Sequence, residues 1–194
     1  MGTLKTTNIQ TITGSGTLTL GTSGETVALG SGVTVTGNGL VGITEADMFR
    51  LTADLTANAN PISSNIERVD DASFSKIGTG VTVSSGTFSF AKTGIYLVIF
   101  NSLASGSTAN DNIFLDLKGT TDNSSYDVLA TGAGGLFGGG SVISTMFCQT
   151  YFDVTDITTH KIQFELSSLQ SGNLIRGHTD KNETTFTFIR LGDT

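Results

Sequence analysis

The sequence predicts an all-β protein in which a β-sandwich head follows an N-terminal arm of short strands rich in Gly, Thr and Ser. Apolar and polar residues alternate along many short runs, which is the period of a β-strand. Turn-forming residues separate the runs: the 194-residue chain has 25 glycines and one proline. From residue 44 onward the runs are rich in β-branched and aromatic residues, which favour strands. The length suits one domain with an appendage.

The arm, residues 1–43, carries only two formally charged side chains, Lys5 and Glu25. Glycine turns such as Gly14-Ser15-Gly16 and Gly37-Asn38-Gly39 divide it into short runs. Apolar residues recur two positions apart in these runs, so each run is expected to be a short strand with one apolar face. These candidate docking residues are Leu18, Leu20, Val27, Leu29, Val33 and Val35.

Strands this short and thinly apolar are not stable alone. Sharing the segment with symmetry-related chains, or docking it on another protein, would bury the Leu/Val face and pair the open strand edges. The arm is therefore interpreted as a docking or intertwining segment. The alternative is a flexible low-complexity tail.

The composition changes near residue 43, where the boundary between the arm and the head, residues 44–194, is expected. Thr44 precedes Asp47 by three positions, which fits a capped helical turn over Thr44–Leu51 within a linker. The later runs are all strand-like: 81–83, 87–90, 94–100, 113–117, 142–153, 161–166 and 184–191. Together they predict a sandwich.

A specific resemblance rests on the stretch FSKIGTGVTVSSGTFSFAKTGIYLVIF, residues 74–100. It is similar to the central signature of the complement globular-head and tumour-necrosis-factor-like jelly rolls, with matching positions Gly86, Phe88, Phe90, Gly94, Ile95 and Tyr96. The closing run Thr185–Leu191 resembles the last strand of that family, except that Phe188 stands where glycine is common. The resemblance spans roughly residues 45–194 and implies a divergent jelly roll.

The resemblance also implies a compact homotrimer. The run Gly94–Phe100 is apolar at nearly every position, so both of its faces need cover, one from the opposite sheet and one from a neighbouring chain. Tyr96 suits either the trimer axis or an ordinary core position. The expected trimer or core residues are Phe88, Phe90, Ile95, Tyr96, Val98, Phe100, Phe186 and Phe188.

A Gly/Thr/Ser repeat arm ahead of such a head resembles tailed-phage structural proteins, including decoration, fibre and adaptor subunits. We therefore expect a virion protein, a trimeric capsid decoration, cement or short-spike subunit that docks on a capsid or tail component through its arm. The alternative is a receptor- or glycan-binding tail fibre tip that contacts a host surface through Asp111-Asn112 and Thr120–Tyr126. The absence of Trp and the presence of only three Tyr disfavour a sugar site of the aromatic-platform kind.

Charge and hydropathy argue against other partners. Seventeen acidic and ten basic residues give a net charge of −7, which disfavours nucleic acid. No stretch approaches the apolar length of a membrane span, so no membrane insertion is expected.

The sequence offers no recognisable catalytic or cofactor motif, so neither enzymatic activity nor a cofactor is expected. His160 and His178 fit no metal-binding spacing, and Cys148, the one cysteine, is interpreted as a small buried hydrophobe. The run Gly132–Gly140 lacks the Lys of a phosphate-binding loop and is expected to be a mobile loop. Some related jelly rolls bind calcium, but no Asp-x-Asp-x-Asp-Gly loop is present.

Overall fold

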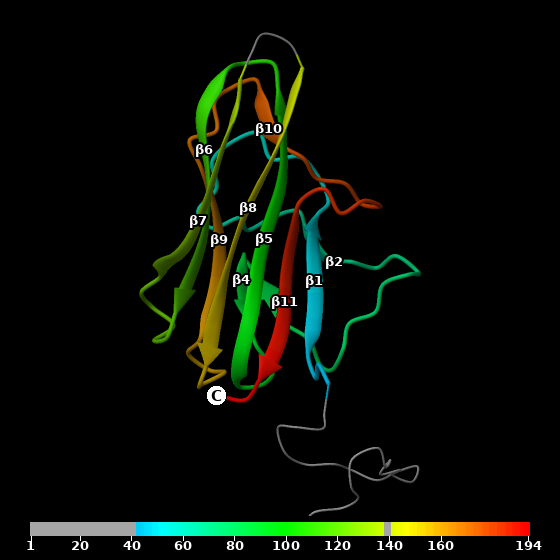
Figure 1. Ribbon diagram of the computed structural model, residues 1–194, viewed down its shortest axis with the longest axis vertical. Coiled ribbons are helices and arrows are strands. Elements are labelled where there is room, and N and C mark those ends of the chain that lie inside the picture. Colours follow the sequence, from blue (N-terminus) through cyan, green and yellow to red (C-terminus); the bar gives the residue numbers. More distant parts are fainter. Residues whose placement is uncertain (1–41, 138–140) are drawn as a thin grey trace, which may run out of the picture. The chain divides into compact units, whose positions relative to one another are not determined.

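A computed structural model describes residues 42–137 and 141–194, and over those ranges the chain is built from strands without helices (Figure 1). The strands are β1 (Ala46–Leu51), β2 (Ile66–Arg68), β3 (Thr82–Ser84), β4 (Thr87–Ser89), β5 (Gly94–Gly106), β6 (Asn110–Thr120), β7 (Asp127–Leu136), β8 (Val142–Val154), β9 (Lys161–Ser167), β10 (Asn173–Ile175) and β11 (Thr185–Gly192). The predicted all-β class is confirmed. No helix in these ranges has the length and apolarity needed to cross a membrane.

The strands form two antiparallel sheets packed face to face. In sheet A, β5 is central: it pairs with β8 on one edge and with β11 and β10 on the other, and β1 and β2 continue the sheet beyond β11. Sheet B has the order β3, β4, β9, β6, β7. Figure 1 shows the long strands β5, β6, β8 and β9 running along the length of the sandwich.

A tight hairpin within the resemblance segment joins β3 to β4, which correspond to the predicted strand-like runs 81–83 and 87–90. Its two turn residues, Ser85 and Gly86, have φ angles of 48° and 78°, the left-handed values that a two-residue hairpin turn needs. A Cβ atom on Gly86 would lie 2.3 Å from the carbonyl oxygen of Ile62. Only glycine therefore fits this turn.

Phenylalanine rings fill the space between the sheets. Phe88 of β4 is fully buried, and its ring centroid lies 5.3 Å from that of Phe164 in β9 and 5.3 Å from that of Phe49 in β1. Phe188, which replaces the common family glycine, packs 5.1 Å from Phe88 and 5.9 Å from Phe90. The departure from the family pattern thus fills the core with another ring.

The helical turn expected over Thr44–Leu51 is wrong, because most of this segment is strand β1. Asp47, Phe49 and Leu51 alternate into the sandwich, and the strand pairs with both β11 and β2. Asp47 does not close a helical cap: its carboxylate accepts a hydrogen bond from the backbone N–H of Val81 at 2.9 Å. Long-range pairing thus overrides the local capping pattern.

The mobile loop expected at Gly132–Gly140 is wrong for its first half, since residues 132–136 belong to β7. Glycine is required here by close packing: a Cβ atom on Gly132 would lie 2.4 Å from the carbonyl oxygen of Phe147 in β8. Gly134 has a similar restriction, because its Cβ would lie 2.6 Å from the Met146 side chain. The small residues let β7 approach β8 across the side of the sandwich. Residues 138–140 lie outside the described part.

The arm lies almost wholly outside the described residues, and so do all six of its candidate docking residues, Leu18 to Val35. The boundary near residue 43 stays a prediction. Strand β1 begins at Ala46, within the predicted head.

Candidate functional site

The outer face of sheet A carries a row of apolar side chains that the sandwich does not cover. In β5, Tyr96, Val98 and Phe100 point into the core, so the alternating residues Ile95, Leu97 and Ile99 lie on the outer face. The register places Leu97 opposite Tyr151 of β8 and opposite Ile189 of β11. Three neighbouring strands therefore contribute to one surface, which we call the outer face of sheet A.

Several large side chains on this face are strongly exposed. In β8, Tyr151 is 69% exposed, Ile143 64% and Phe147 50%, whereas the intervening Met146 and Cys148 are buried. In β11, Leu191 is 53% exposed. Monomeric proteins seldom leave large aromatic and aliphatic side chains grouped in this way, so the face has the character of an interaction surface.

An apolar depression of about 360 Å³ marks one end of this face and is lined by Ile95, Tyr151, Leu191 and Gly192. The polar residues Gln149 and Thr187 lie further along the same face, opposite Ile99 of β5 in its two neighbouring strands. Apolar and uncharged polar groups therefore alternate over most of this face, and Asp153 of β8, exposed and opposite Ile95, adds one carboxylate at its end. Such a surface suits a protein partner.

The expected trimer or core residues separate into two groups. Seven of them are buried in the sandwich: Phe88, Phe90, Tyr96, Val98, Phe100, Phe186 and Phe188. Tyr96 is an interior residue whose hydroxyl donates to the carbonyl oxygen of Lys92 at 3.0 Å. Only Ile95, 36% exposed, lies on the outer face of sheet A.

The exposed residues of β8 and β11 were not among the expected site residues. A signal for them exists in the sequence: Ile143, Phe147 and Tyr151 are spaced four apart, and an even spacing puts side chains on the same face of a strand. Met146, Cys148 and Phe152 occupy the other face and are buried. A strand that carries large apolar side chains on both of its faces needs a packing partner on each face.

A buried guanidinium, that of Arg50 in β1, forms an ion-pair cluster at the β1–β2 end of sheet A. Arg50 is 1% exposed, and it donates to Glu67 at 2.8 Å and to Asp70 and Asp71 at 2.6 Å each. Burial alone would lower the pKa of Arg50, but the carboxylates of Glu67 and Asp71 raise it above its usual value. The cluster ties β1 to β2 and to the loop after β2.

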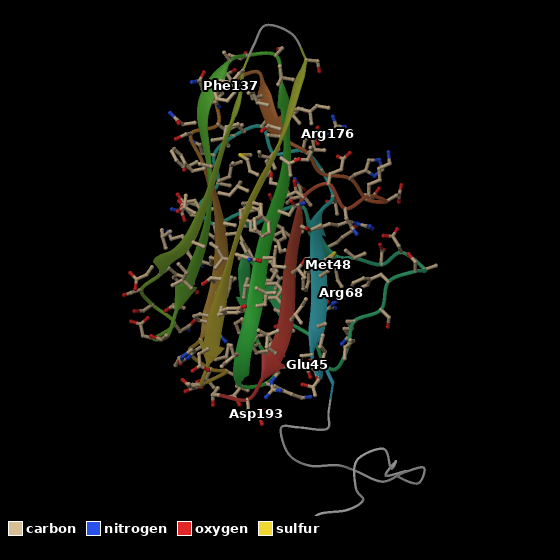
Figure 2. All side chains as sticks on the ribbon, in the orientation of Figure 1. Glu45, Met48, Arg68, Phe137, Arg176 and Asp193 are labelled. Carbon is tan, nitrogen blue, oxygen red and sulfur yellow. The ribbon has the colours of Figure 1, made fainter. Side chains whose placement is uncertain are left out.

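Two buried carboxylates hold the segment that leads into β3. Glu45 Oε2 accepts from the Gly80 N–H at 2.7 Å, and Asp47 also binds the Arg68 guanidinium, with Oδ1 3.0 Å from Nε. Lys92 forms an ion pair with Glu45 at 2.6 Å. Figure 2 shows Glu45 and Asp193 at the same end of the head, opposite the end that carries Phe137. These groups organise the fold at the end where the described chain begins and ends.

The remaining ionisable residues do not converge. His160 is buried against the hydroxyls of Thr155 and Thr159, at 3.2 and 3.1 Å. Burial raises the pKa of the Cys148 thiol to about 11, and the thiol donates to the carbonyl oxygen of Leu115. Over residues 42–137 and 141–194, no group of three or more His, Cys, Asp or Glu side chains is arranged to hold a metal ion.

The two loops named for the alternative receptor site lie at opposite ends of β6. Asn112 is near the start of the strand and Thr120 is its last residue. Eight residues of extended strand separate them, roughly 27 Å at 3.4 Å per residue. The structure therefore does not bring Asp111-Asn112 and Thr120–Tyr126 into one site.

Comparison with known proteins bears on the fold. No family model matches the sequence, and no curated protein sequence matches it. Among solved structures, the Eiger TNF of S. frugiperda superposes with a TM-score of 0.59 at 15% identity, covering 77% of this chain and 93% of that one. Murine APRIL superposes with a TM-score of 0.52 at 11% identity, covering 76% and 98%. The globular domain of a zebrafish complement 1qA protein has a TM-score of 0.49 at 17% identity, covering 77% and 99%.

The head is therefore a TNF-like jelly roll, as the resemblance implied. The similar structures are matched over nearly their whole length, and the matched part of this chain is of the size of its head. At these identities the likeness establishes the fold.

Proposed function

We propose that this chain is a non-enzymatic structural subunit whose jelly-roll heads assemble into a homotrimer through the outer face of sheet A. The observation that carries this proposal is the group of exposed apolar side chains on β5, β8 and β11, centred on the depression lined by Ile95, Tyr151 and Leu191. Taking a side chain of this size from full exposure to full burial contributes about 1.5–3 kcal/mol, and Ile95, Leu191 and Tyr151, which are 36%, 53% and 69% exposed, gain the corresponding part of it at an interface. A second and third copy of the chain supply the cover that one copy lacks.

The resemblance to the complement globular-head and tumour-necrosis-factor-like jelly rolls supports a homotrimer, because domains of that family assemble as three sandwiches about a common axis. The composition of the face supports a contact between identical copies. None of the four residues that line the depression, Ile95, Tyr151, Leu191 and Gly192, is charged. Asp153 stands opposite Ile95 on the same face, so the contact must leave this carboxylate at its solvent-exposed rim.

Within this class we propose the virion of a tailed phage as the setting, with the trimer serving as a capsid decoration, cement or short-spike subunit. This step is supported by the sequence of residues 1–43, whose Gly/Thr/Ser turns and thin Leu/Val faces suit a segment that docks on another virion protein. The remaining 151 residues form the head, with no long shaft between the two parts.

Particle incorporation tests the docking step. Changing Leu18, Leu20, Val27 and Leu29 together to Asp places four charges on the proposed buried face of the arm. The variant should form trimers of unchanged mass and thermal stability yet fail to enter particles assembled without the native chain. Normal incorporation of the variant, or absence of the native chain from purified particles, would contradict the virion role while leaving the head trimer intact.

A further inference from the structure

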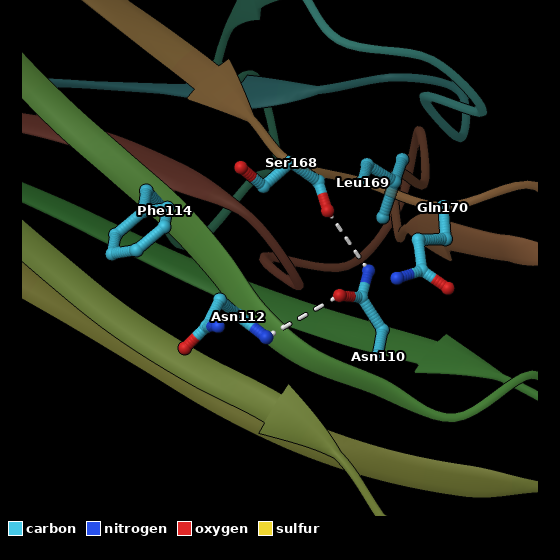
Figure 3. Close-up of a pocket in the computed structure, with 6 residues that line it drawn as sticks. All are labelled: Asn110, Asn112, Phe114, Ser168, Leu169 and Gln170. Atoms are coloured by element: carbon cyan, nitrogen blue, oxygen red, sulfur yellow. Dashed lines mark hydrogen bonds between the residues drawn. The ribbon is translucent and has the colours of Figure 1, made fainter.

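A polar hollow of about 420 Å³ lies where β6 begins and β9 ends, away from the outer face of sheet A. Six residues line it: Asn110, Asn112, Phe114, Ser168, Leu169 and Gln170. Figure 3 shows Asn112 and Phe114 on β6 and the other wall formed by the segment after β9. The volume is within the range of sites that bind small molecules.

The walls of the hollow are held by hydrogen bonds from two sides, two of them partly buried and one exposed. Asn110 is 1% exposed, and its side-chain amide donates to the carbonyl oxygen of Ser168 at 3.0 Å while its oxygen accepts from the backbone N–H of Asn112 at 3.4 Å (Figure 3). On the far side, Asn58 accepts from the Leu169 N–H at 2.8 Å. The segment is thus held from two directions.

Ser168 itself has a φ angle of 61°, an uncommon left-handed conformation for a residue other than glycine. Such a conformation persists where the surroundings impose it. The bond from Asn110 to the Ser168 carbonyl is one such restraint, so the hollow exists before any ligand arrives. A preformed site avoids the entropy cost of ordering its walls on binding.

The lining offers uncharged hydrogen-bonding groups beside apolar surface. The side-chain amides of Asn112 and Gln170 make no hydrogen bond to any other described residue, so each has a donor and an acceptor available. Phe114 and Leu169 supply apolar surface, and none of the six lining residues is ionisable. The ligand that matches is neutral, carries several hydroxyl groups and has an apolar face.

Two observations argue against other ligands. A peptide strand cannot extend the sheet along β6, because β6 is already paired with β7 and with β9. An anionic ligand finds no cation in the lining and meets a chain with a net charge of −7. A sugar ring satisfies the remaining requirements, since its hydroxyls bind amides and its C–H face packs on an aromatic ring.

The hollow also lies at the far end of the head from the chain entry. β5 runs from beside Gly192 at one end to beside Asn173 at the other, and the Asn173 N–H donates to the Gln170 carbonyl oxygen. Thr44, near the start of the described chain, accepts from Arg190 at the Gly192 end.

We propose that this hollow binds a neutral saccharide, with the amides of Asn112 and Gln170 hydrogen-bonding its hydroxyls and Phe114 packing on its apolar face. The proposal holds for a trimer or a monomer and does not require the virion role.

Saturation-transfer NMR on the full chain tests it with glucose, galactose, mannose and N-acetylglucosamine as neutral probes and N-acetylneuraminic acid as the anionic counterpart. At least one neutral sugar should bind with millimolar affinity. Asn112→Ala combined with Gln170→Ala should weaken that binding about tenfold or more, since both removed groups are hydrogen-bond partners of the sugar. Asn182→Ala, which removes an exposed amide outside the hollow, should leave it unchanged.

Three results would overturn the proposal: no transfer to any neutral sugar, transfer only to N-acetylneuraminic acid, or equal binding by the native chain and the double variant. Thermal unfolding of the double variant should match the native chain, because both side chains lie at the surface and make no hydrogen bond to described residues.

Discussion

Tyr151 of β8 lies directly opposite Leu97 of β5 on the outer face of sheet A, and its side chain is 69% exposed. Each has a buried neighbour on the other face of its strand, Tyr96 in β5 and Phe152 in β8. The strands are therefore apolar on two sides, and the head on its own covers only one of them. This relationship is the basis of the proposed trimer.

The ring cluster around Phe88 should dominate the stability of the head. Phe88→Ala removes a fully buried ring that contacts four others, and it should lower the free energy of unfolding by about 3–5 kcal/mol. Phe137→Ala, at a side chain 68% exposed, is the control and should change it by no more than about 0.5 kcal/mol. Denaturant unfolding measures both. Equal losses in the two variants would show that the ring cluster is not the main core.

Gly132 should tolerate no side chain. In Gly132→Ala the new Cβ would lie 2.4 Å from the carbonyl oxygen of Phe147, so β7 and β8 must move apart at a cost of about 1–3 kcal/mol. Gly42→Ala is the control, because nothing lies within 4 Å of a Cβ there. Thermal unfolding compares them, and an unchanged melting temperature for Gly132→Ala would rule out this close packing.

The Glu45 ion pair should make the head sensitive to acid. Burial alone would raise the pKa of Glu45, but Lys92 and the backbone N–H of Gly80 hold it below its ordinary value of 4.5. A pKa lowered by folding contributes stability above about pH 4.5, and that contribution is lost as the pH falls through the folded-state pKa.

Melting temperatures measured across this pH range should therefore fall more steeply for the native chain than for Glu45→Gln. The variant should be the less stable of the two at neutral pH, and the two curves should converge in acid. Parallel curves would mean that Glu45 does not contribute to the pH dependence.

Cys148 should be inert in the folded head. The residue is 5% exposed, and burial raises the pKa of its thiol to about 11, so little reactive thiolate exists at neutral pH. Iodoacetamide should modify it far more slowly in the native chain than in the chain unfolded with guanidinium. Equal rates in the two states would contradict the buried position.

The sequence could predict those elements whose local pattern and tertiary role agree. The β3–β4 hairpin combines alternation with a glycine turn, and the first half of β5 is a continuous apolar run rich in strand-forming residues; both were expected as strands. Strand β7 was missed because its glycines, needed for contact with β8, carry no strand propensity. Segment 44–51 was predicted wrongly as a helical turn, because its local sequence fits a helix cap whereas its strand structure comes from long-range pairing with β2 and β11.

The candidate sites were less accessible to sequence analysis for the same reason. The trimer face depends on a register that sets Tyr151 beside Leu97, and the saccharide hollow depends on the bond from Asn110 to Ser168, 58 residues later. Neither relationship is local in the chain. Alternation along β8 does reveal its exposed apolar side, once both faces of the strand are considered.

The mass of the full chain in solution tests the central claim most directly, through two variants matched in exposure. Leu191 lies on the outer face of sheet A and Val128 on β7, and both are 53% exposed. Light scattering should give three times the chain mass for the native protein and for Val128→Asp. Leu191→Asp should shift the protein to monomer, because it would place an unpaired charge in the interface. A native protein that stays monomeric at micromolar concentration, or a Leu191→Asp trimer as stable as the native one, would contradict assembly through this face.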